Sequence, residues 1–473
     1  MKPVSALSLL LGFALAACQT SVLAATPPLT VTETRSTAVP IGSPTAPPAS
    51  CTDLDAAWGQ DWPRALAVLA ALQTQSTSCG PEPLASKTYA ARVSYGASLE
   101  TLGDVDGAVT QYMAAFALDP DRQEAWSALQ RLGRLPDPTA APCDPDRPSL
   151  AAYVPLDTSA RYVTAQNREL RLGDAPYTVR GLNYYPRHAP WRDFLTSADA
   201  TEMAAELDLI QQAGFNSLRV FLWYDVLFTC APEDAIPVAP TFERFDSLLR
   251  LAHERGLRVM VTLNDLPDLV YRPLYTDWPR YDAQTQFIVS RYRSEGTILA
   301  WDLRNEGDLD YGGRSPLEAR FTASQVLDWL THVSALVRGA DPNHLLTAGW
   351  WGDPVPTESA VDVLSFHHWS DAAQLTGRVS DYLSRSSKPV LLQEVGYHSW
   401  ATAPQDARDE ATQATLVQSV THTAQSAGLA GWMIWTAFDF DPPPGQTPTH
   451  EHFFGLWHSD LSPKPALAAV IAP

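Results

Sequence analysis

Two glutamates close two strand-like stretches and have the side-chain chemistry of an acid–base pair. Glu306 ends the stretch 301–306 (WDLRNE), which continues the apolar run 296–300, and Glu394 lies near the end of the Pro-containing apolar run 388–396. Removal from water raises the pKa of a carboxyl group, and a general acid that works near neutral pH needs a raised pKa. For Glu306 alone, an ion pair with a nearby arginine explains the residue equally well. The second glutamate shifts the interpretation toward chemistry.

The elements that must position these glutamates are predicted to be strands of one parallel barrel. From residue 153 to residue 473, apolar strand-like runs alternate with helical patterns, which is typical of an α/β fold, the (β/α)8 or TIM barrel. The predicted strands are Thr178–Asn183, Asn216–Leu222, Leu257–Leu263, Ile298–Arg304, His344–Gly349, Val361–His367, Pro389–Glu394 and Ala430–Thr436. The predicted helices are Ala200–Ala213, Thr241–Arg255, Asp282–Ser294, Ala323–Gly339, Gln374–Ser384 and Asp409–Ala427. Both glutamates would then face one rim, and paired carboxylates on one rim are equipment for hydrolysing glycosidic bonds.

Two details of the barrel can also be predicted. Only about a dozen residues separate the fifth predicted strand from the sixth, so the helix between them is expected to be reduced or missing. Ahead of the first strand, the stretch 168–173 (RELRLG) is expected to be part of a hairpin that seals the bottom of the barrel.

Six short motifs occur in order at the predicted strand ends and resemble those of a known enzyme family. They are 180–185 (RGLNYY), 218–220 (LRV), 301–306 (WDLRNE), 366–369 (FHHW), 393–394 (QE) and 431–435 (GWMIW). The tail 454–457 (FGLW) and 463–466 (PKPA) follows them. From about residue 155 to residue 473, the chain resembles glycoside hydrolase clan A, most closely family 5, which includes endoglucanases and β-mannanases.

The resemblance implies a role for each of the two glutamates in a retaining reaction. Glu306 corresponds to the general acid/base, and Glu394 corresponds to the nucleophile. Retaining enzymes hold these carboxyl groups roughly 5–5.5 Å apart. Arg219 would keep Glu394 ionised, and Asn305 would bind the sugar 2-hydroxyl. The alternatives are a structural arginine at position 219 and a loop-capping asparagine at position 305.

The resemblance also bears on further contacts around the sugar. His367 would lie near Glu306 or the sugar and tune proton transfer, unless it is a hydrogen-bonded histidine of the core. Trp435 would stack under the sugar ring. Trp369 is expected to bind the substrate, but it stands where the family pattern has tyrosine, so it cannot make the hydroxyl contact with the nucleophile that this tyrosine provides. The third strand lacks the histidine that many members carry, and Asn264 or Asp265 is expected to replace its substrate contact.

Other aromatic residues at strand ends are open to two interpretations. Each could form a platform for a sugar ring or could belong to the core. They are Tyr184, Tyr185, Trp223, Trp350, Trp351 and Trp457. Trp432 is expected in the core, and His368 is expected to face away from the site because side chains alternate along a strand.

The N-terminus has the features of an export signal. Residues 1–17 combine Lys2 with a short apolar region and end before Cys18, in the pattern LAAC of a bacterial lipobox. We therefore expect a lipoprotein anchored at Cys18 on the cell surface or in the periplasm, with cleavage after Ala24 and secretion as the alternative. Residues 18–50 are rich in Thr, Pro and Ser, which favours a disordered tether. Beyond the N-terminus, no apolar run is long enough to span a bilayer.

The four remaining cysteines predict two disulfides in an exported chain. Cys51 and Cys79 flank one helical stretch and form the most natural pair, which leaves Cys143 for Cys230. Free buried thiols are the alternative. No cysteine or histidine spacing indicates a zinc site, and we expect no metal and no cofactor.

Residues 51–135 predict a small all-α domain that precedes the barrel. Small and aromatic residues recur there at the spacing of a tetratricopeptide-like helical pair, with a generic helical hairpin as the alternative. These residues are Gly96, Leu99, Gly103, Ala108, Tyr112, Ala115, Asp119 and Pro120, and Trp126 and Leu129 resemble the start of a further repeat. The protein partner of this domain is unknown. Five prolines in residues 136–152 indicate a linker.

Composition narrows the class of partner. The formal net charge is −20 over 473 residues, which argues against nucleic acid and anionic membrane surfaces and is compatible with a neutral polysaccharide or oligosaccharide. We therefore expect contact with the membrane through the lipid anchor only. The expected substrate is a β-1,4-linked mannan or glucan. The alternatives are an exo-acting β-glycosidase of the same clan and a non-catalytic surface protein that binds carbohydrate or acts as a scaffold.

Overall fold

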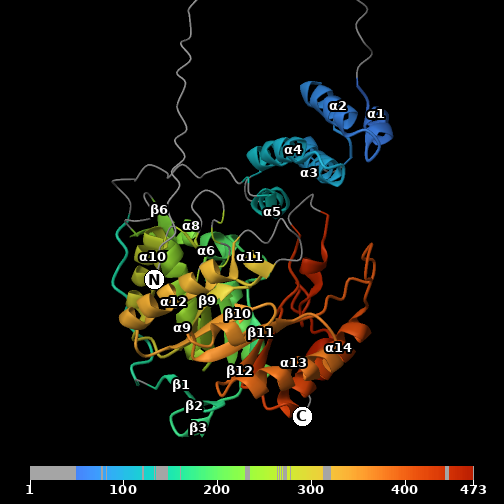
Figure 1. Ribbon diagram of the computed structural model, residues 1–473. Helices are drawn as coiled ribbons and strands as arrows, with labels where there is room; N and C mark the ends of the chain where they lie inside the picture. The colour runs from blue at the N-terminus through green and yellow to red at the C-terminus, as the bar shows by residue number, and fades with distance from the viewer. Residues whose placement is uncertain are drawn as a thin grey trace, which may run out of the picture. The chain divides into compact units, whose positions relative to one another are not determined.

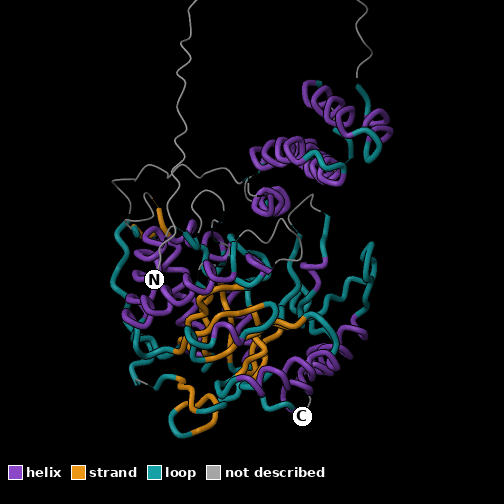
Figure 2. The backbone as a smooth tube through the Cα atoms, viewed as in Figure 1, coloured by secondary structure: helices purple, strands orange, loops and turns teal. Residues whose placement is uncertain are grey.

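Eight parallel strands close into a barrel in the computed structural model (Figures 1 and 2). The structure describes residues 49–471 except 76–77, 81–82, 120–121, 133, 135–147, 160, 230–234, 264, 266, 268, 270–273, 277, 313–320 and 443–446. The barrel strands are β4 (Val179–Asn183), β5 (Ser217–Phe221), β8 (Arg258–Thr262), β9 (Ile298–Asn305), β10 (Leu345–Trp350), β11 (Val363–His368), β12 (Val390–Val395) and β13 (Gly431–Ile434). Each matches a strand predicted from the sequence to within two residues at either end, so the (β/α)8 fold is confirmed.

Helices surround the barrel and connect successive strands (Figure 2). The long ones are α7 (Ala200–Gln212), α9 (Ala239–Glu254), α10 (Trp278–Tyr292), α12 (Ala323–Ala340), α13 (Ala372–Arg385) and α14 (Glu410–Ser426). Short elements of the loops and the C-terminus are α6 (Asp193–Ser197), α8 (Tyr224–Leu227), β6 (Phe228–Thr229), β7 (Ile236–Pro237), α11 (Leu309–Gly312), η3 (His450–Phe453) and α15 (Pro465–Ile471). Between β10 and β11, the 3-10 turn η2 (Val355–Thr357) is the helical element that the structure describes. The predicted reduction of that helix is therefore confirmed.

Local sequence explains where a helix begins and which of its sides faces the barrel, and α12 is an example. The Thr322 side chain accepts a hydrogen bond from the backbone N–H of Gln325, and the Gln325 side chain accepts one from the backbone N–H of Thr322. These two bonds form a capping box at the start of the helix. Apolar residues at helical spacing then face the barrel, and the buried ones are Val326, Trp329, Leu330, Val333 and Val337. The helix thus covers the outer face of the barrel with one apolar stripe.

An antiparallel sheet closes the bottom of the barrel, at the amino ends of its strands (Figure 1). It consists of β1 (Val163–Gln166), β2 (Glu169–Leu172) and β3 (Ala175–Pro176). Val163 and Leu170 of this sheet are buried in one apolar cluster with side chains from the barrel strands, namely Val179, Met260, Leu299, Ala300, Leu345, Val363, Leu391, Ala430 and Met433. The predicted hairpin is therefore present and seals the barrel with apolar contacts.

Five helices form the N-terminal segment of the described chain. They are α1 (Cys51–Ala57), α2 (Trp62–Thr74), α3 (Leu84–Thr101), α4 (Val105–Leu118) and α5 (Gln123–Leu132). A Cβ atom at Gly96 would lie 2.6 Å from the Tyr112 ring, so the absence of a side chain at Gly96 allows α3 and α4 to approach. A disulfide joins Cys51 to Cys79, as predicted. None of the described helices has the length and apolar character needed to cross a bilayer.

Several sequence predictions fall outside the described residues. They concern the export signal 1–17, Cys18, most of the tether 18–50, residues 135–147 of the linker region, the pair Cys143 and Cys230, and Asn264.

Candidate active site

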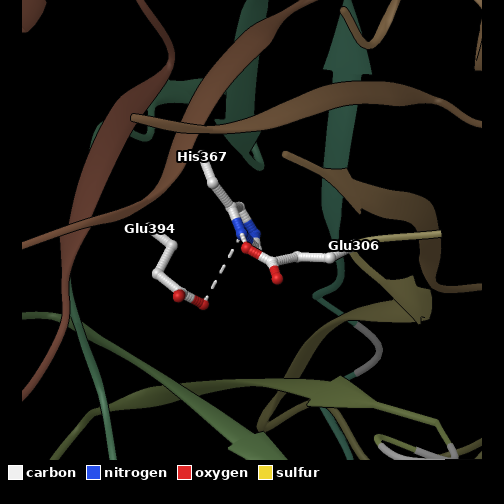
Figure 3. Close-up of side chains that lie close together, drawn as sticks. All are labelled: Glu306, His367 and Glu394. Atoms are coloured by element: carbon white, nitrogen blue, oxygen red, sulfur yellow. Dashed lines mark hydrogen bonds and ion pairs between the residues drawn. The ribbon is translucent and has the colours of Figure 1, made fainter. Parts of the chain in front are cut away.

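Glu306 and Glu394 meet at the carboxyl ends of two barrel strands, with His367 beside both. Glu306 directly follows β9, Glu394 lies in β12, and His367 lies in β11 between them in the chain. His367 Nδ1 is 2.9 Å from Glu306 Oε1 and 3.8 Å from Glu394 Oε2. The three side chains point toward one another (Figure 3), and one ligand atom from each lies within 4.8 Å of the others. The sequence prediction that the two carboxylates share one rim is therefore matched by the geometry.

The backbone around Glu306 explains how its side chain enters the site. Its φ is 52°, a left-handed conformation that L residues rarely adopt, and its N–H donates to Gly349 O at 2.6 Å. A Cβ atom at Gly349 would lie 2.1 Å from Gln393 Oε1 and 2.7 Å from His367 Nε2. Glycine is therefore required at 349 for the close approach of these side chains.

Arg219 is a buried cation that joins the two strands bearing the glutamates. Its Nη1 donates to Glu394 Oε2 at 2.7 Å and to Asn183 Oδ1 at 3.1 Å. Its Nη2 donates to Asp302 Oδ2 and Asn305 Oδ1, each at 2.8 Å, and its Nε donates to Asp302 Oδ2 at 3.0 Å. All three nitrogens of the guanidinium therefore have partners, as a fully buried charge requires. The sequence pattern indicated the pairing with Glu394 but not the shared carboxylate of Asp302.

The electrostatics of the site reflect its burial. Burial raises the pKa of the Glu394 carboxyl to about 7, although the positive charges of His367 and Arg219 oppose the rise. Burial alone lowers the pKa of the His367 imidazole, but the carboxylates of Glu394 and Glu306 outweigh this effect and raise the pKa above its usual value. The charged forms of Glu394 and His367 therefore stabilise each other.

Asn264 and Asp265 are the two candidates for a substrate contact on the third strand, and of these the structure describes Asp265. It lines the cavity above the glutamates, and burial raises the pKa of its carboxyl to about 6 against the opposing charges of Arg219 and Arg304. Tyr185 Oη donates to Asp265 Oδ2 at 3.2 Å. Its other carboxylate oxygen, Oδ1, has no hydrogen-bond partner among the described residues.

A cavity of about 930 Å³ opens above the two glutamates and has aromatic and polar walls. Trp435 follows β13, lines the cavity and donates from Nε1 to Glu451 Oε2 at 3.2 Å. Trp369 also lines it and packs edge-on against Phe454, with ring centroids 5.9 Å apart. Other residues that line it include Trp191, Phe221, Asn305, His398, Trp400, Asp406, Arg408 and His450. Such a cavity suits a ligand with apolar faces and many hydroxyl groups.

The remaining aromatic candidates separate into core and partly buried residues. Five of them are buried and belong to the core, namely Tyr184, Tyr185, Trp223, Trp350 and Trp457. Trp351 is half-buried. Trp432 is fully buried, as expected, and His368 contacts Arg378 and Asp371 on the other side of the strand.

Trp400 and His398 line the cavity but were not predicted from the sequence. Both lie in the loop that leaves β12 a few residues after Glu394. Their place in the first loop after a candidate catalytic residue was the available signal, because barrel enzymes build their sites from the loops at strand carboxyl ends.

Glu306, His367 and Glu394 also have the ligand types and spacing that a divalent cation could use. Arg219 already provides a positive charge 2.7 Å from Glu394 Oε2, and a second cation there would be repelled. The electrostatics therefore favour acid–base chemistry over metal binding at this group.

Comparisons with known proteins agree with the geometry. The family model described as Cellulase (glycosyl hydrolase family 5) matches residues 181–438. The chain is 25% identical over 276 residues to mannan endo-1,4-beta-mannosidase A of Podospora anserina, which covers 46% of this chain and 69% of that protein. It is also 25% identical over 231 residues to mannan endo-1,4-beta-mannosidase F of Aspergillus fumigatus, which covers 42% of this chain and 49% of that protein.

Solved structures show the same fold. The exo-beta-1,4-mannosidase Op5Man5 from Opitutaceae bacterium strain TAV5 superposes with a TM-score of 0.54 at 22% identity, covering 65% of this chain and 61% of that chain. A GH5_18 protein from Streptomyces cattleya, solved in complex with GlcNAc, superposes with a TM-score of 0.51 at 22% identity, covering 63% of this chain and 80% of that chain.

Proposed function

The chain belongs to glycosyl hydrolase family 5, and from this premise we propose that it is a retaining hydrolase of a β-1,4-linked polysaccharide. The names of the curated relatives favour β-1,4-mannan over β-1,4-glucan as the substrate. The spacing of the two carboxylates carries the proposal, because an oxygen of Glu306 and an oxygen of Glu394 lie within 4.8 Å of each other. That distance is near the roughly 5–5.5 Å between carboxyl groups of retaining enzymes and below the roughly 6.5–9.5 Å of inverting ones.

In the first step, Glu394 attacks the anomeric carbon and Glu306 protonates the leaving oxygen. The glycosidic C–O bond breaks, and an ester forms between the sugar and Glu394. The attack requires the ionised carboxylate, which the Arg219 guanidinium favours from 2.7 Å away. Since burial raises the pKa of Glu394 to about 7, the ionised fraction in the empty site grows as pH rises toward and past that value.

In the second step, Glu306 removes a proton from water as the water oxygen attacks the same carbon. The ester bond breaks, Glu394 leaves as a carboxylate, and Glu306 regains its proton for the next cycle. His367, 2.9 Å from Glu306, is placed to stabilise the carboxylate that Glu306 becomes once it has given its proton to the leaving oxygen.

Residues around the carboxylates would hold the sugar. Trp435 offers an aromatic surface under the ring, and Asn305, fixed by Arg219, is assigned to the 2-hydroxyl group. Asp265 is the described candidate for the substrate contact on the third strand, and Trp369 forms part of the wall. The amide of Asn305 donates from Nδ2, because its oxygen already accepts from Arg219.

Release of reducing sugar from mannan, glucan and xylan tests the proposal. Wild-type protein is expected to release sugar from β-1,4-mannan, while Glu306→Gln and Glu394→Gln each reduce the rate by at least about 10³-fold, since each removes a group that acts in the transition state. Circular dichroism of the three proteins shows whether each variant is folded. Equal activity in all three folded proteins would show that Glu306 and Glu394 do not carry the reaction. Activity in none would favour the non-catalytic carbohydrate-binding alternative.

We also propose that the protein is exported and anchored by lipid at Cys18, and that in the sequence the helical domain 51–135 separates the tether from the barrel. The LAAC pattern supports this, and so does the disulfide between Cys51 and Cys79, because disulfides persist in oxidising compartments outside the cytosol.

A further inference from the structure

Trp400 gives the cavity a second aromatic surface beyond Trp435. It lies in the loop after β12 and lines the same cavity as Glu306 and Glu394. One face of its indole ring stacks on Phe453, with ring centroids 5.5 Å apart and planes inclined by 18°. Trp400 is half-buried and lines the cavity, so part of the ring that Phe453 does not cover is accessible from the cavity.

One short helix, η3, fixes both tryptophans. Its residue Glu451 accepts the hydrogen bond from Trp435 Nε1 at 3.2 Å, and its residue Phe453 supports the Trp400 ring from behind. The two rings are therefore held by residues two positions apart in the sequence. A rigid support of this kind sets a fixed spacing between two aromatic surfaces in one cavity.

The loop that carries Trp400 is closed by its own backbone. Trp400 O accepts from the N–H groups of Ala403 at 3.2 Å and Arg408 at 3.3 Å. These two bonds hold the loop in a compact turn, so little ordering of the loop is required when a ligand arrives.

A buried lysine ties the same loop to η3. Ser399 N donates to Phe453 O at 3.0 Å, and Lys464 Nζ donates to Ser399 Oγ at 2.9 Å and to Phe453 O at 3.3 Å. Lys464 is 2% exposed and also pairs with Asp439 at 2.6 Å. The support behind the Trp400 ring is therefore part of a packed polar network.

Polar side chains accompany Trp400 along the cavity wall. His398, Gln405, Asp406 and Arg408 all line the cavity, and Asp406 pairs with Arg408 at 2.6 Å. A sugar ring presents apolar C–H faces and a rim of hydroxyl groups. An aromatic surface with donors and acceptors at its edge is complementary to both.

We propose that Trp400 is the platform of a second sugar subsite, which binds a neighbouring ring of the chain whose cleaved ring lies at Trp435. The inference rests on the proposed function, and it names the substrate class more closely as an oligomer or polymer that places sugars at both tryptophans. In the protein, Trp400 contributes to substrate affinity and leaves bond cleavage unaffected.

Steady-state kinetics on a β-1,4-linked tetrasaccharide of mannose, together with one of glucose, test the subsite. Trp400→Ala is expected to raise KM about tenfold with kcat within twofold of wild type, the loss expected for one aromatic contact. Trp400→Phe keeps a flat ring and is expected to stay within threefold of wild type, which also guards against misfolding of the alanine variant. Trp58→Ala, an exposed tryptophan of the helical segment, is the matched control and is expected to behave as wild type.

Calorimetric titration of the same tetrasaccharides into Glu394→Gln, with and without Trp400→Ala, separates the subsite from the chemistry. The subsite predicts about a tenfold weaker Kd in the double variant. Unchanged Kd, or a loss confined to kcat, would overturn it. If the wild-type protein binds the tetrasaccharide but cleaves nothing, the proposed function fails while the titration still decides the subsite. If it neither binds nor cleaves, both fail.

Discussion

The two ends of the barrel are built from the same strands but have opposite chemistry. At the bottom, β9 contributes Leu299 and Ala300 to an apolar cluster sealed by the β1–β3 sheet. At the rim, the same strand contributes Asp302 and Asn305 to the hydrogen bonds of a buried arginine. Likewise, β12 places Leu391 in the apolar cluster and ends near Glu394. Both β9 and β12 therefore change from apolar to ionisable side chains within a few residues.

The bottom of the barrel contributes to the stability of the fold, whereas the rim reduces it. Apolar burial at the bottom stabilises the fold directly. At the rim, charged groups are withdrawn from water and need one another as partners, so the arrangement carries a desolvation cost that serves the chemistry. Substitutions at the two ends should therefore separate stability from activity.

Arg219→Met is expected to have the largest effect, because it removes the cation of the rim. The variant leaves Glu394 and Asp302 buried without their main partner, which should lower the free energy of unfolding by about 3–5 kcal/mol. It should also reduce kcat/KM by about 10²–10³-fold, since the ionised nucleophile loses its stabilising charge. Chemical denaturation and rate measurements on the same preparation check both effects.

The control for that variant is Arg385→Met. Arg385 pairs with Asp353 and Asp381 on the surface, where a salt bridge contributes at most about 1 kcal/mol. If Arg219→Met were as stable and active as the control, the rim would not depend on its buried cation.

Leu170→Ala tests the bottom of the barrel. Leu170 is 3% exposed in the apolar cluster, so its truncation should cost about 2–4 kcal/mol of unfolding free energy. At a temperature where the variant stays folded, kcat/KM should match wild type because the substitution lies at the opposite end from the glutamates. A parallel loss of kcat/KM in fully folded protein would contradict the division between the two ends.

The pH dependence of the free energy of unfolding tests whether Glu394 at the rim is perturbed by burial. The Glu394 pKa is raised from 4.5 to about 7 by folding, so between these values the folded state keeps a proton that the unfolded state releases. The contribution of Glu394 to the free energy of unfolding is therefore fully present below pH 4.5 and is lost as pH rises through 7. Glu394→Gln lacks this titration.

The free energy of unfolding of Glu394→Gln should therefore rise relative to that of the wild type, by about 1–3 kcal/mol between pH 4.5 and pH 7.5, because only the wild type loses stability over this range. Denaturant titrations across that range measure it. Parallel pH curves for the two proteins would show that Glu394 is not perturbed by burial. Leu170→Ala supplies the comparison from the bottom, since its effect should not vary with pH.

Much of the barrel was predictable because its strands are continuous apolar runs. All eight strands were located from such runs, and the reduced connection between β10 and β11 followed from chain length alone. The pairing of Glu306 with Glu394 then followed from topology, since parallel strands in a barrel expose their carboxyl ends on one rim.

The contacts within the site were less predictable, because they depend on how side chains pack. In the sequence, Asp302 is an acidic residue that follows an apolar run, with nothing to indicate its partner. Its contact with Arg219 depends on the closure of the barrel. Trp400 lies in a loop, where no periodicity indicates which way a side chain points. Trp350 follows the same pattern as a platform residue, yet it is fully buried, with Nε1 bonded to Tyr311.

The anomeric configuration of the first product distinguishes double displacement from single displacement. Proton NMR during early hydrolysis of a β-1,4-linked oligosaccharide by the wild-type protein distinguishes the two anomers before they interconvert. Two facing carboxylates that act by double displacement predict that the β-anomer forms first and the α-anomer appears only by later mutarotation. Initial release of the α-anomer would contradict the account, because it would require a single displacement by water.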